Sequence, residues 1–177
     1  VHRISINPQT FNEEVLKDLN RFFYIILFDE IYVKAKEMGF IINMDLILGL
    51  PGETTNDILY TLQKTREYDM QNLTIHNLAI KRSSQLNKEN YTHVKNLNYK
   101  KIYSEIYNLT RSKELYPYYM YRQKNSFQGG ENIGYSVKDK ESIYNIEMIE
   151  ENKTVIGIGA GAIVEGKMIH GLLHPEM

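Results

Sequence analysis

Short apolar runs alternate with longer stretches of helical spacing through the first half of the chain. The runs predict three β-strands, at residues 3–7, 40–48 and 72–79. The stretches between them predict two helices, at residues 13–38 and 54–68. This order is typical of parallel strands joined by right-handed crossovers. The first half is therefore expected to be a parallel α/β unit.

Two side chains compete to cap the first predicted helix. Thr10 and Glu13 have the spacing of a capping box, in which two side chains satisfy backbone N–H groups reciprocally. Asn12 is the competing N-cap, because asparagine also accepts bonds from the first N–H groups of a helix. Gly39 supplies the stop at the carboxyl end.

The second half of the chain follows a different pattern. A polar stretch at residues 81–96 precedes apolar spacing that predicts a helix over residues 97–115. A polar turn at residues 150–153 indicates that the strands on either side of it form an antiparallel hairpin. The strands predicted in this half are residues 118–123, 142–149 and 154–158. The chain is thus expected to be half a parallel barrel or sheet, followed by a smaller antiparallel region.

Composition narrows the function classes. The chain has 177 residues, with 21 Lys and Arg against 22 Asp and Glu, and this balance argues against a nucleic-acid partner. The absence of cysteine excludes disulfides, zinc–thiolate sites and an iron–sulfur cluster held by the chain's own thiolates. The longest apolar run, Phe22–Phe28, is shorter than the about 20 residues of a membrane span. Without a signal-peptide pattern, a cytoplasmic protein or a piece of one is expected, with no membrane partner.

Candidate chemistry lies where the predicted parallel strands end, because ligands of α/β proteins bind at the carboxyl ends of the strands. Gln9, Asp45, His76 and Asn77 fall there. Asp45 is flanked by apolar residues, so its carboxylate needs a partner or a polar pocket. From the residues alone, Asp45 is either a carboxylate that anchors a turn or one that binds a ligand. Taken singly, His76 fits a core histidine, and Gln9 fits a helix cap.

Six segments in the same order together resemble the oxygen-independent coproporphyrinogen III oxidases, which are radical S-adenosylmethionine enzymes. INPQ, AIKRSS and YRQKN make the HemZ-type branch of that family the most similar. The resemblance covers residues 1–162. The segments are RISINPQTFN, GFIINMDLILGLPGET, NLTIHNLAIKRSS, YYMYRQKN, ENIGYS and KESIYNIEMIEENKTVIGIGAGA.

The resemblance implies an α/β fold built on a partial (β/α) barrel. Residues 1–81 would be the C-terminal half of the radical S-adenosylmethionine barrel, with its last three parallel strands. Residues 82–177 would add a helix and an antiparallel region that covers the substrate. The family's CxxxCxxC loop, which binds a 4Fe–4S cluster, has no counterpart here. The chain is therefore expected to be a fragment, cut at the start of the fourth barrel strand and inactive by itself.

The activity implied for the parent protein is the oxidative decarboxylation of coproporphyrinogen III to protoporphyrinogen IX in haem biosynthesis. Its cofactors would be S-adenosylmethionine and a 4Fe–4S cluster whose ligands are absent from this chain. Its partners would be the porphyrinogen, an electron donor and an electron acceptor. Two alternatives stay open: a haem-binding chaperone of the same fold, and a fragment that keeps the fold but binds nothing.

The resemblance also assigns site residues. Gln9, Arg21 and Asp45 match positions that contact S-adenosylmethionine in the family, and groups from His76 to Ala79 line the same pocket. Neither a catalytic base nor a metal ligand is expected in this segment. A substrate with four propionates needs cations. The candidates are Lys81, Arg82, Arg122 and Lys124.

A chain cut in this way is also expected to self-associate. The strand at residues 3–7 would have an unpaired edge, and Phe22–Phe28 places seven apolar residues in a row. Unpaired edges and exposed apolar faces both favour contacts between copies.

Overall fold

The computed structural model divides into two compact units, Val1–Glu141 and Ser142–Met177. The boundary predicted between residues 81 and 82 lies outside the described residues. The structure describes residues 2–18, 25–79, 96–124 and 126–150, with the backbone of residues 155–156 and 164–165.

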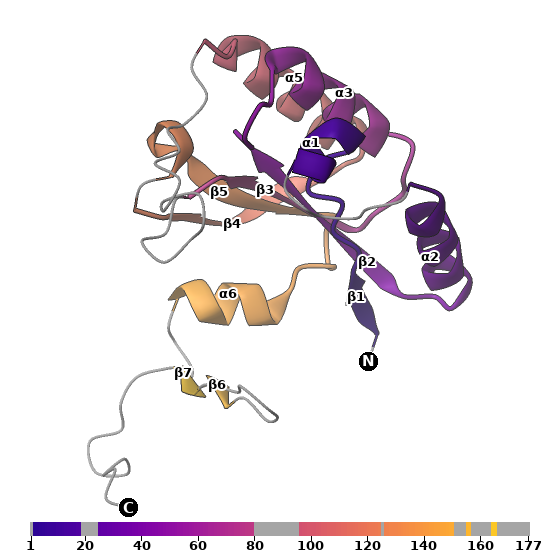
Figure 1. Ribbon diagram of the computed structural model, residues 1–177. Helices are drawn as coiled ribbons and strands as arrows, with labels where there is room; N and C mark the ends of the chain where they lie inside the picture. The colour runs from indigo at the N-terminus through magenta and orange to yellow at the C-terminus, as the bar shows by residue number, and fades with distance from the viewer. Residues whose placement is uncertain are drawn as a thin grey trace, which may run out of the picture. The chain divides into compact units, whose positions relative to one another are not determined.

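A mixed, open five-stranded sheet forms the first unit, in the order β1-β2-β3-β5-β4 (Figure 1). β1 (Arg3–Ser5), β2 (Ile41–Leu48) and β3 (Asn72–Asn77) are parallel, which confirms the three strands predicted for the first half. β5 (Glu131–Ser136) runs antiparallel to β3, and β4 (Tyr116–Arg122) runs antiparallel to β5. The antiparallel strands therefore extend the parallel sheet.

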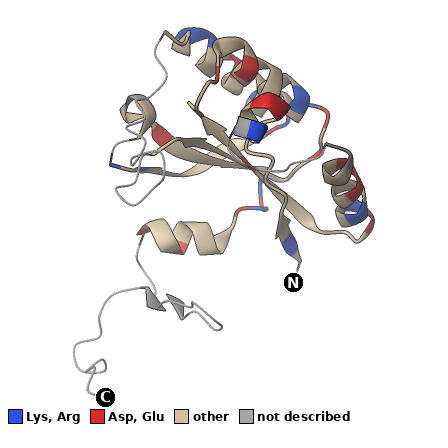
Figure 2. Cartoon of the chain, in the orientation of Figure 1, with Lys and Arg blue, Asp and Glu red and all other residues tan. Residues whose placement is uncertain are grey.

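Helices α1, α3 and α5 lie together on one side of this sheet (Figure 1). Their bounds are Glu13–Asp18 for α1, Thr55–Thr65 for α3 and Tyr99–Ser112 for α5, and α2 spans Ile25–Glu37. α1 and α2 fall within the single helix predicted at residues 13–38, and α3 and α5 match the other two predicted helices. Lys, Arg, Asp and Glu positions recur along the helices of this unit (Figure 2).

The covered face of the sheet forms the core because apolar residues occupy alternate positions of the strands. On β2, Met44 and Leu46 are fully buried, and they belong to one cluster with Ile58 of α3 and Ile102 of α5. Among the described residues, no helix is both long and apolar enough to cross a membrane.

Asn12, rather than Thr10, caps α1. The side-chain oxygen of Asn12 accepts hydrogen bonds from the N–H groups of Glu14 and Val15, at 3.0 and 3.2 Å. The hydroxyl of Thr10 instead lies 2.9 Å from the hydroxyl of Thr61, and this buried bond ties the start of α1 to α3.

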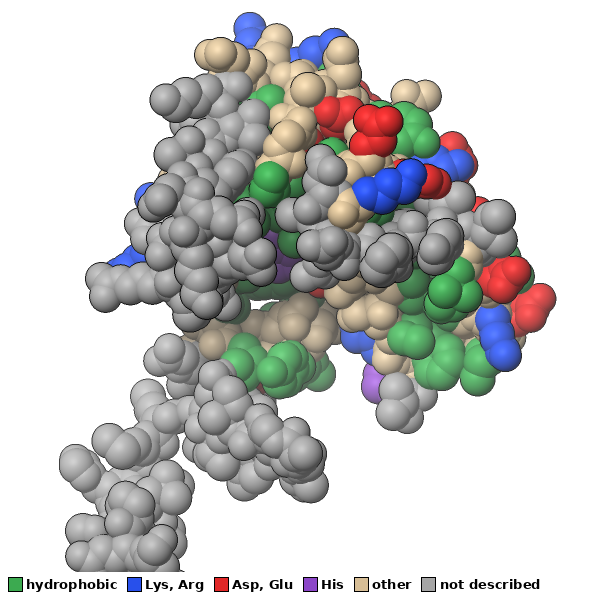
Figure 3. Space-filling model, viewed as in Figure 1, with side chains coloured by type: hydrophobic (Ala, Val, Ile, Leu, Met, Phe, Trp, Pro, Cys, Tyr) green, Lys and Arg blue, Asp and Glu red, His purple; other side chains and the backbone are tan. Residues whose placement is uncertain are grey.

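α2 has two unlike faces. Phe28 and Ala35 are buried in the core, whereas Leu27 and Ile31 are 53% and 43% exposed. Figure 3 shows hydrophobic side chains among charged ones at the surface on this side of the molecule. β1, beside β2, is also an edge strand of the sheet. An exposed apolar helix face and an edge strand both favour contacts between copies of the chain. Self-association stays a prediction.

The structure differs from the predicted elements at two segments of the second half. Residues 142–149 were predicted as a strand, but Ile143–Glu150 form helix α6. Isoleucines 143, 146 and 149 recur every three residues, a helical spacing, and the N–H of Ile146 donates to the carbonyl of Ser142 at 3.2 Å. β5 was not predicted, because only Ile133 and Tyr135 supply an apolar alternation there.

The predicted hairpin of residues 142–149 with 154–158 is therefore wrong. β6 (Val155–Ile156) lies within the second of these segments, and it pairs antiparallel with β7 (Val164–Glu165).

Candidate functional site

The face of the sheet opposite α1, α3 and α5 carries a row of positions drawn from four strands. Neighbouring partners in a ladder point to the same face of a sheet. Asp45 of β2 pairs with Thr74 of β3, Thr74 pairs with Gly134 of β5, and Gly134 pairs with Tyr119 of β4. Because these residues alternate with core residues such as Met44, the row faces away from α1, α3 and α5.

Side-chain hydrogen-bond donors surround the carboxylate of Asp45. The Nδ2 groups of Asn7 and Asn43 donate to its two carboxylate oxygens, at 2.8 and 2.9 Å. Nε2 of His76 lies 3.8 Å from Oδ2 of Asp45, and a quarter of the Asp45 side chain stays exposed. A carboxylate offers about four acceptor positions. Asp45 can therefore still accept hydrogen bonds from a ligand.

The surroundings of Asp45 stabilise its charged form. Burial alone would raise the pKa of this carboxyl, but the His76 ring, the Asn43 amide and the Thr74 hydroxyl outweigh burial. The pKa of Asp45 consequently lies below its ordinary value. Asp45 is thus an ionised acceptor at neutral pH, suited to O–H and N–H donors.

The turn after β2 is anchored by Glu53. Oε2 of Glu53 accepts from the N–H groups of Gly49 and Leu50, at 2.8 and 3.1 Å. Burial raises the pKa of Glu53 to about 8, although these two N–H groups act to lower it. Glu53 therefore holds the turn, and the polar contacts of Asp45 lie on the sheet face.

Gln9 continues the parallel ladder past the end of β1. Its N–H donates to the carbonyl of Asp45 at 3.0 Å, and its carbonyl accepts from the N–H of Ile47 at 2.8 Å. Its φ of 63° is uncommon for a residue other than glycine, and such conformations cluster at functional sites. The structure thus brings Gln9, Asp45 and His76 together at the carboxyl ends of three strands, and Ala79, just past β3, bridges to Ser126.

Two tyrosines of β4 complete this face, and sequence reasoning missed both. The hydroxyl of Tyr121 lies 3.4 Å from Nδ1 of His76, and the hydroxyl of Tyr119 lies 3.1 Å from the hydroxyl of Thr74. The two rings stack with centroids 6.4 Å apart. Their spacing of two residues within a predicted strand was the available signal, since it places both on one face.

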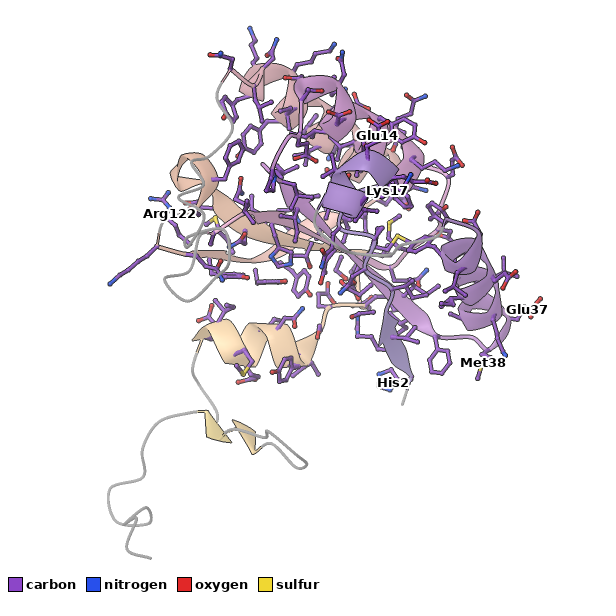
Figure 4. All side chains as sticks on the ribbon, viewed as in Figure 1. His2, Glu14, Lys17, Glu37, Met38 and Arg122 are labelled. Atoms are coloured by element: carbon purple, nitrogen blue, oxygen red, sulfur yellow. The ribbon has the colours of Figure 1, made fainter. Side chains whose placement is uncertain are left out.

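The structure does not bring the described candidate cations to Asp45. Arg122 follows Tyr121 on the strand, so its side chain leaves the opposite face, where it pairs with Glu131 at 2.8 Å. Figure 4 shows Arg122 on the side of the molecule opposite Glu37, the last residue of α2, and Met38. Lys124 is exposed. Three other predicted site residues, Arg21, Lys81 and Arg82, lie outside the described residues.

Within the described part of the chain, no group of three or more His, Asp or Glu residues is placed to hold a metal ion.

Comparison with known proteins places this geometry in context. No protein-family model matches the chain. The chain is 40% identical over 165 residues to the oxygen-independent coproporphyrinogen-III oxidase-like protein HemZ of Bacillus subtilis (strain 168), covering 92% of this chain and 33% of that protein. Over 84 residues it is 34% identical to the oxygen-independent coproporphyrinogen III oxidase of Escherichia coli (strain K12), covering 44% of this chain and 17% of that enzyme.

A further relative is the heme chaperone HemW of Lactococcus lactis subsp. lactis (strain IL1403), 27% identical over 92% of this chain and 41% of that protein. Among solved structures, the Escherichia coli coproporphyrinogen III oxidase HemN, a radical SAM enzyme, shares the fold with a TM-score of 0.60 and 19% identity. That match covers 94% of this chain and 35% of HemN. The chain thus spans about a third of the length of HemZ, and it is homologous to the HemZ-like oxygen-independent coproporphyrinogen III oxidases.

Proposed function

We propose that this chain is part of a radical S-adenosylmethionine oxidoreductase that decarboxylates coproporphyrinogen III oxidatively to protoporphyrinogen IX in haem biosynthesis. Within it, the Asp45 site binds S-adenosylmethionine. The observation that carries the proposal is an ionised Asp45 beside Gln9 and His76, at the carboxyl ends of three parallel strands. The 40% identity to a HemZ protein supports the same assignment.

The carboxylate of Asp45 is chemically suited to that cofactor. S-adenosylmethionine presents ribose hydroxyls, an adenine amino group and an ammonium, all of which donate hydrogen bonds. The carboxylate of Asp45 accepts such bonds, and Asn7 and Asn43 fix its orientation. The role of these residues is to bind the cofactor and orient it.

The 4Fe–4S cluster does not fit the residues of this chain. Such clusters are held by cysteine thiolates, and the 177 residues include none. In this family the bound cofactor supplies one-electron chemistry that needs the cluster. These residues therefore cannot start that reaction unless the cysteines come from outside this sequence.

The substrate side of the proposal rests on the basic residues near the end of β4. Arg122 would exchange its partner Glu131 for a propionate, because a guanidinium binds either carboxylate through the same N–H groups. Coproporphyrin III, which carries the same four propionates, is a suitable probe. Arg122→Glu is expected to weaken its binding several-fold while S-adenosylmethionine binding stays unchanged.

A haem-binding role is the second candidate, favoured by the match to a heme chaperone over 92% of the chain. Titration with haem separates the two proposals. A saturable shift of the haem absorbance, with no affinity for S-adenosylmethionine, would favour the chaperone role.

Calorimetric titration of the chain with S-adenosylmethionine tests the main proposal. Asp45→Asn removes the charge at the site and is expected to weaken binding by about 1–3 kcal/mol. Asp69→Asn is the matched control, because it makes the same change at a surface ion pair with Lys36. Equal affinity of Asp45→Asn and Asp69→Asn would overturn the assignment of Asp45.

A further inference from the structure

His76 lies between two polar groups that differ in what they can offer its ring. Nε2 faces the carboxylate of Asp45 at 3.8 Å, and Nδ1 faces the hydroxyl of Tyr121 at 3.4 Å. An ionised carboxylate only accepts hydrogen bonds, whereas a phenol can donate or accept. His76 joins β3 to β2 on one side and to β4 on the other.

This arrangement selects one tautomer of a neutral His76. If the proton were on Nδ1, the bare lone pair of Nε2 would face the negative charge of Asp45, which is unfavourable. With the proton on Nε2, the N–H points at Asp45 and Nδ1 accepts from the hydroxyl of Tyr121. The separation of 3.8 Å is longer than a hydrogen bond, and contacts of this kind tighten when a ligand binds.

Tyr121 is itself held in place by its neighbours. Its ring stacks on that of Tyr119, whose hydroxyl is fixed to Thr74. The ring of Tyr119 lies across Gly134, where an added Cβ would come within 1.8 Å of a ring carbon. Burial raises the pKa of Tyr119 to about 12 and also raises that of Tyr121, so both phenols keep their protons at neutral pH. Tyr121 can therefore act as a donor to His76.

We propose that His76 is a positioning residue for Asp45: the charge of Asp45 selects the tautomer that points Nε2–H at the carboxylate, and Tyr121 supports it by donating to Nδ1. The pair fixes the orientation of Asp45 and leaves its remaining acceptor positions open to the hydroxyl or N–H donors of the ligand. Binding of that ligand closes the gap between His76 and Asp45 to a hydrogen bond. The ligand part of this inference rests on the proposed function, in which the ligand is S-adenosylmethionine.

The first arm of the test needs no ligand. Long-range proton–nitrogen NMR of the labelled chain reports which ring nitrogen of each histidine carries the proton. The signals of His76 are identified among the five histidines by their loss in His76→Gln. The Nε2–H form is expected in the native chain, and a mixture of tautomers in Asp45→Asn, because an amide can donate to Nε2 as well as accept from it. In Tyr121→Phe, but not in Tyr119→Phe, the Nδ1 signal should shift, because it loses the hydrogen bond from the hydroxyl. An unchanged tautomer in Asp45→Asn would overturn the selection by Asp45, and an unshifted Nδ1 signal in Tyr121→Phe would overturn the role of Tyr121.

The second arm measures the affinity for S-adenosylmethionine. His76→Leu, which has no donor, is expected to weaken binding about tenfold. His76→Gln keeps an N–H at similar reach and should restore most of that loss, and Tyr121→Phe should lose about threefold. Equal affinities of His76→Leu and the native chain would refute the positioning of Asp45 by His76. A native chain that binds no cofactor would refute the proposed function and the ligand part of this inference, while the NMR arm would still decide whether Asp45 selects the tautomer and Tyr121 supports it.

Discussion

The two faces of the five-stranded sheet come from the same strands but differ in what they contribute. On β2, Met44 and Leu46 are buried under the helices, while Asp45 between them faces the polar side with a quarter of its side chain exposed. On β3, Leu73 is fully buried, and its neighbour Thr74 bonds a tyrosine across the sheet. The alternation of a strand thus lets a single segment build the core and the candidate site.

The turn after β2 and the polar face of the sheet also differ in how they accommodate a carboxyl group. The carboxyl of Glu53 is buried at the turn after β2, and its pKa is raised. Asp45 is surrounded by donors on the polar face, and its pKa is lowered. A rise in pH should therefore lower the contribution of Glu53 to the free energy of unfolding and raise the contribution of Asp45.

The largest change in the free energy of unfolding is expected from the titration of Glu53. Its pKa is about 8 in the fold and about 4.5 when unfolded, so the folded state holds a proton that the unfolded state releases between these values. The stability from this group is full below pH 4.5 and falls by about 3–5 kcal/mol as pH rises through 8. Urea unfolding from pH 5 to 8 should show this loss.

Glu53→Gln should remove that part of the pH dependence, and Glu67→Gln, at the surface, should leave it intact. A loss of stability that is the same in Glu53→Gln and the native chain would contradict the assignment of a buried, protonated Glu53.

The next largest effect is the difference in stability between alanine substitutions of two neighbours on opposite faces of β2. Leu46→Ala leaves a cavity under the helices and should lower the free energy of unfolding by about 2–5 kcal/mol. Ile47→Ala changes the adjacent, half-buried residue on the polar side, and should cost less than half as much. Chemical denaturation measures both. Equal costs would show that the two faces are not distinct in packing.

A smaller effect is expected at Gly134, on the polar face. Gly134→Ala forces the ring of Tyr119 aside, because the new Cβ overlaps it, and should cost about 1–3 kcal/mol. In a Tyr119→Ala background the same change should cost little, which makes a double-mutant cycle the measurement. Additive costs would mean that the ring does not lie across Gly134.

The smallest effect is expected from acid titration of Asp45. Its lowered pKa contributes stability that is present above the ordinary value of 3.8 and is lost as pH falls through the folded value. Unfolding measured from pH 5 to 3 should therefore show a steeper loss for the native chain than for Asp45→Asn. Parallel curves would contradict a stabilised charge at Asp45.

Sequence reasoning reached the parallel half of the sheet because its signals are local. Residues 40–48 form a long apolar run closed by Gly49, and Asp45 is conspicuous within it. β5 was missed because a strand in the middle of a sheet can contain polar residues and glycine when its partners supply the packing. Gly134 is such a case, since its role depends on Tyr119 of another strand.

The candidate site was predictable only in part for the same reason. Gln9, Asp45 and His76 were proposed because Gln9 follows the first predicted strand, Asp45 lies near the end of the second, and His76 lies on the third. Tyr119 and Tyr121 were missed, because β4 reaches this site only through its pairing with β5, a strand that was not predicted.

The most direct test of the polar face as the binding site is an amide NMR titration of the labelled chain with S-adenosylmethionine. We expect saturable shifts at Gln9, Asp45 and Ile47, and at the residues from His76 to Ala79, with α2 and α5 unaffected. Shifts confined to the helices, or none at millimolar cofactor, would contradict binding at the polar face.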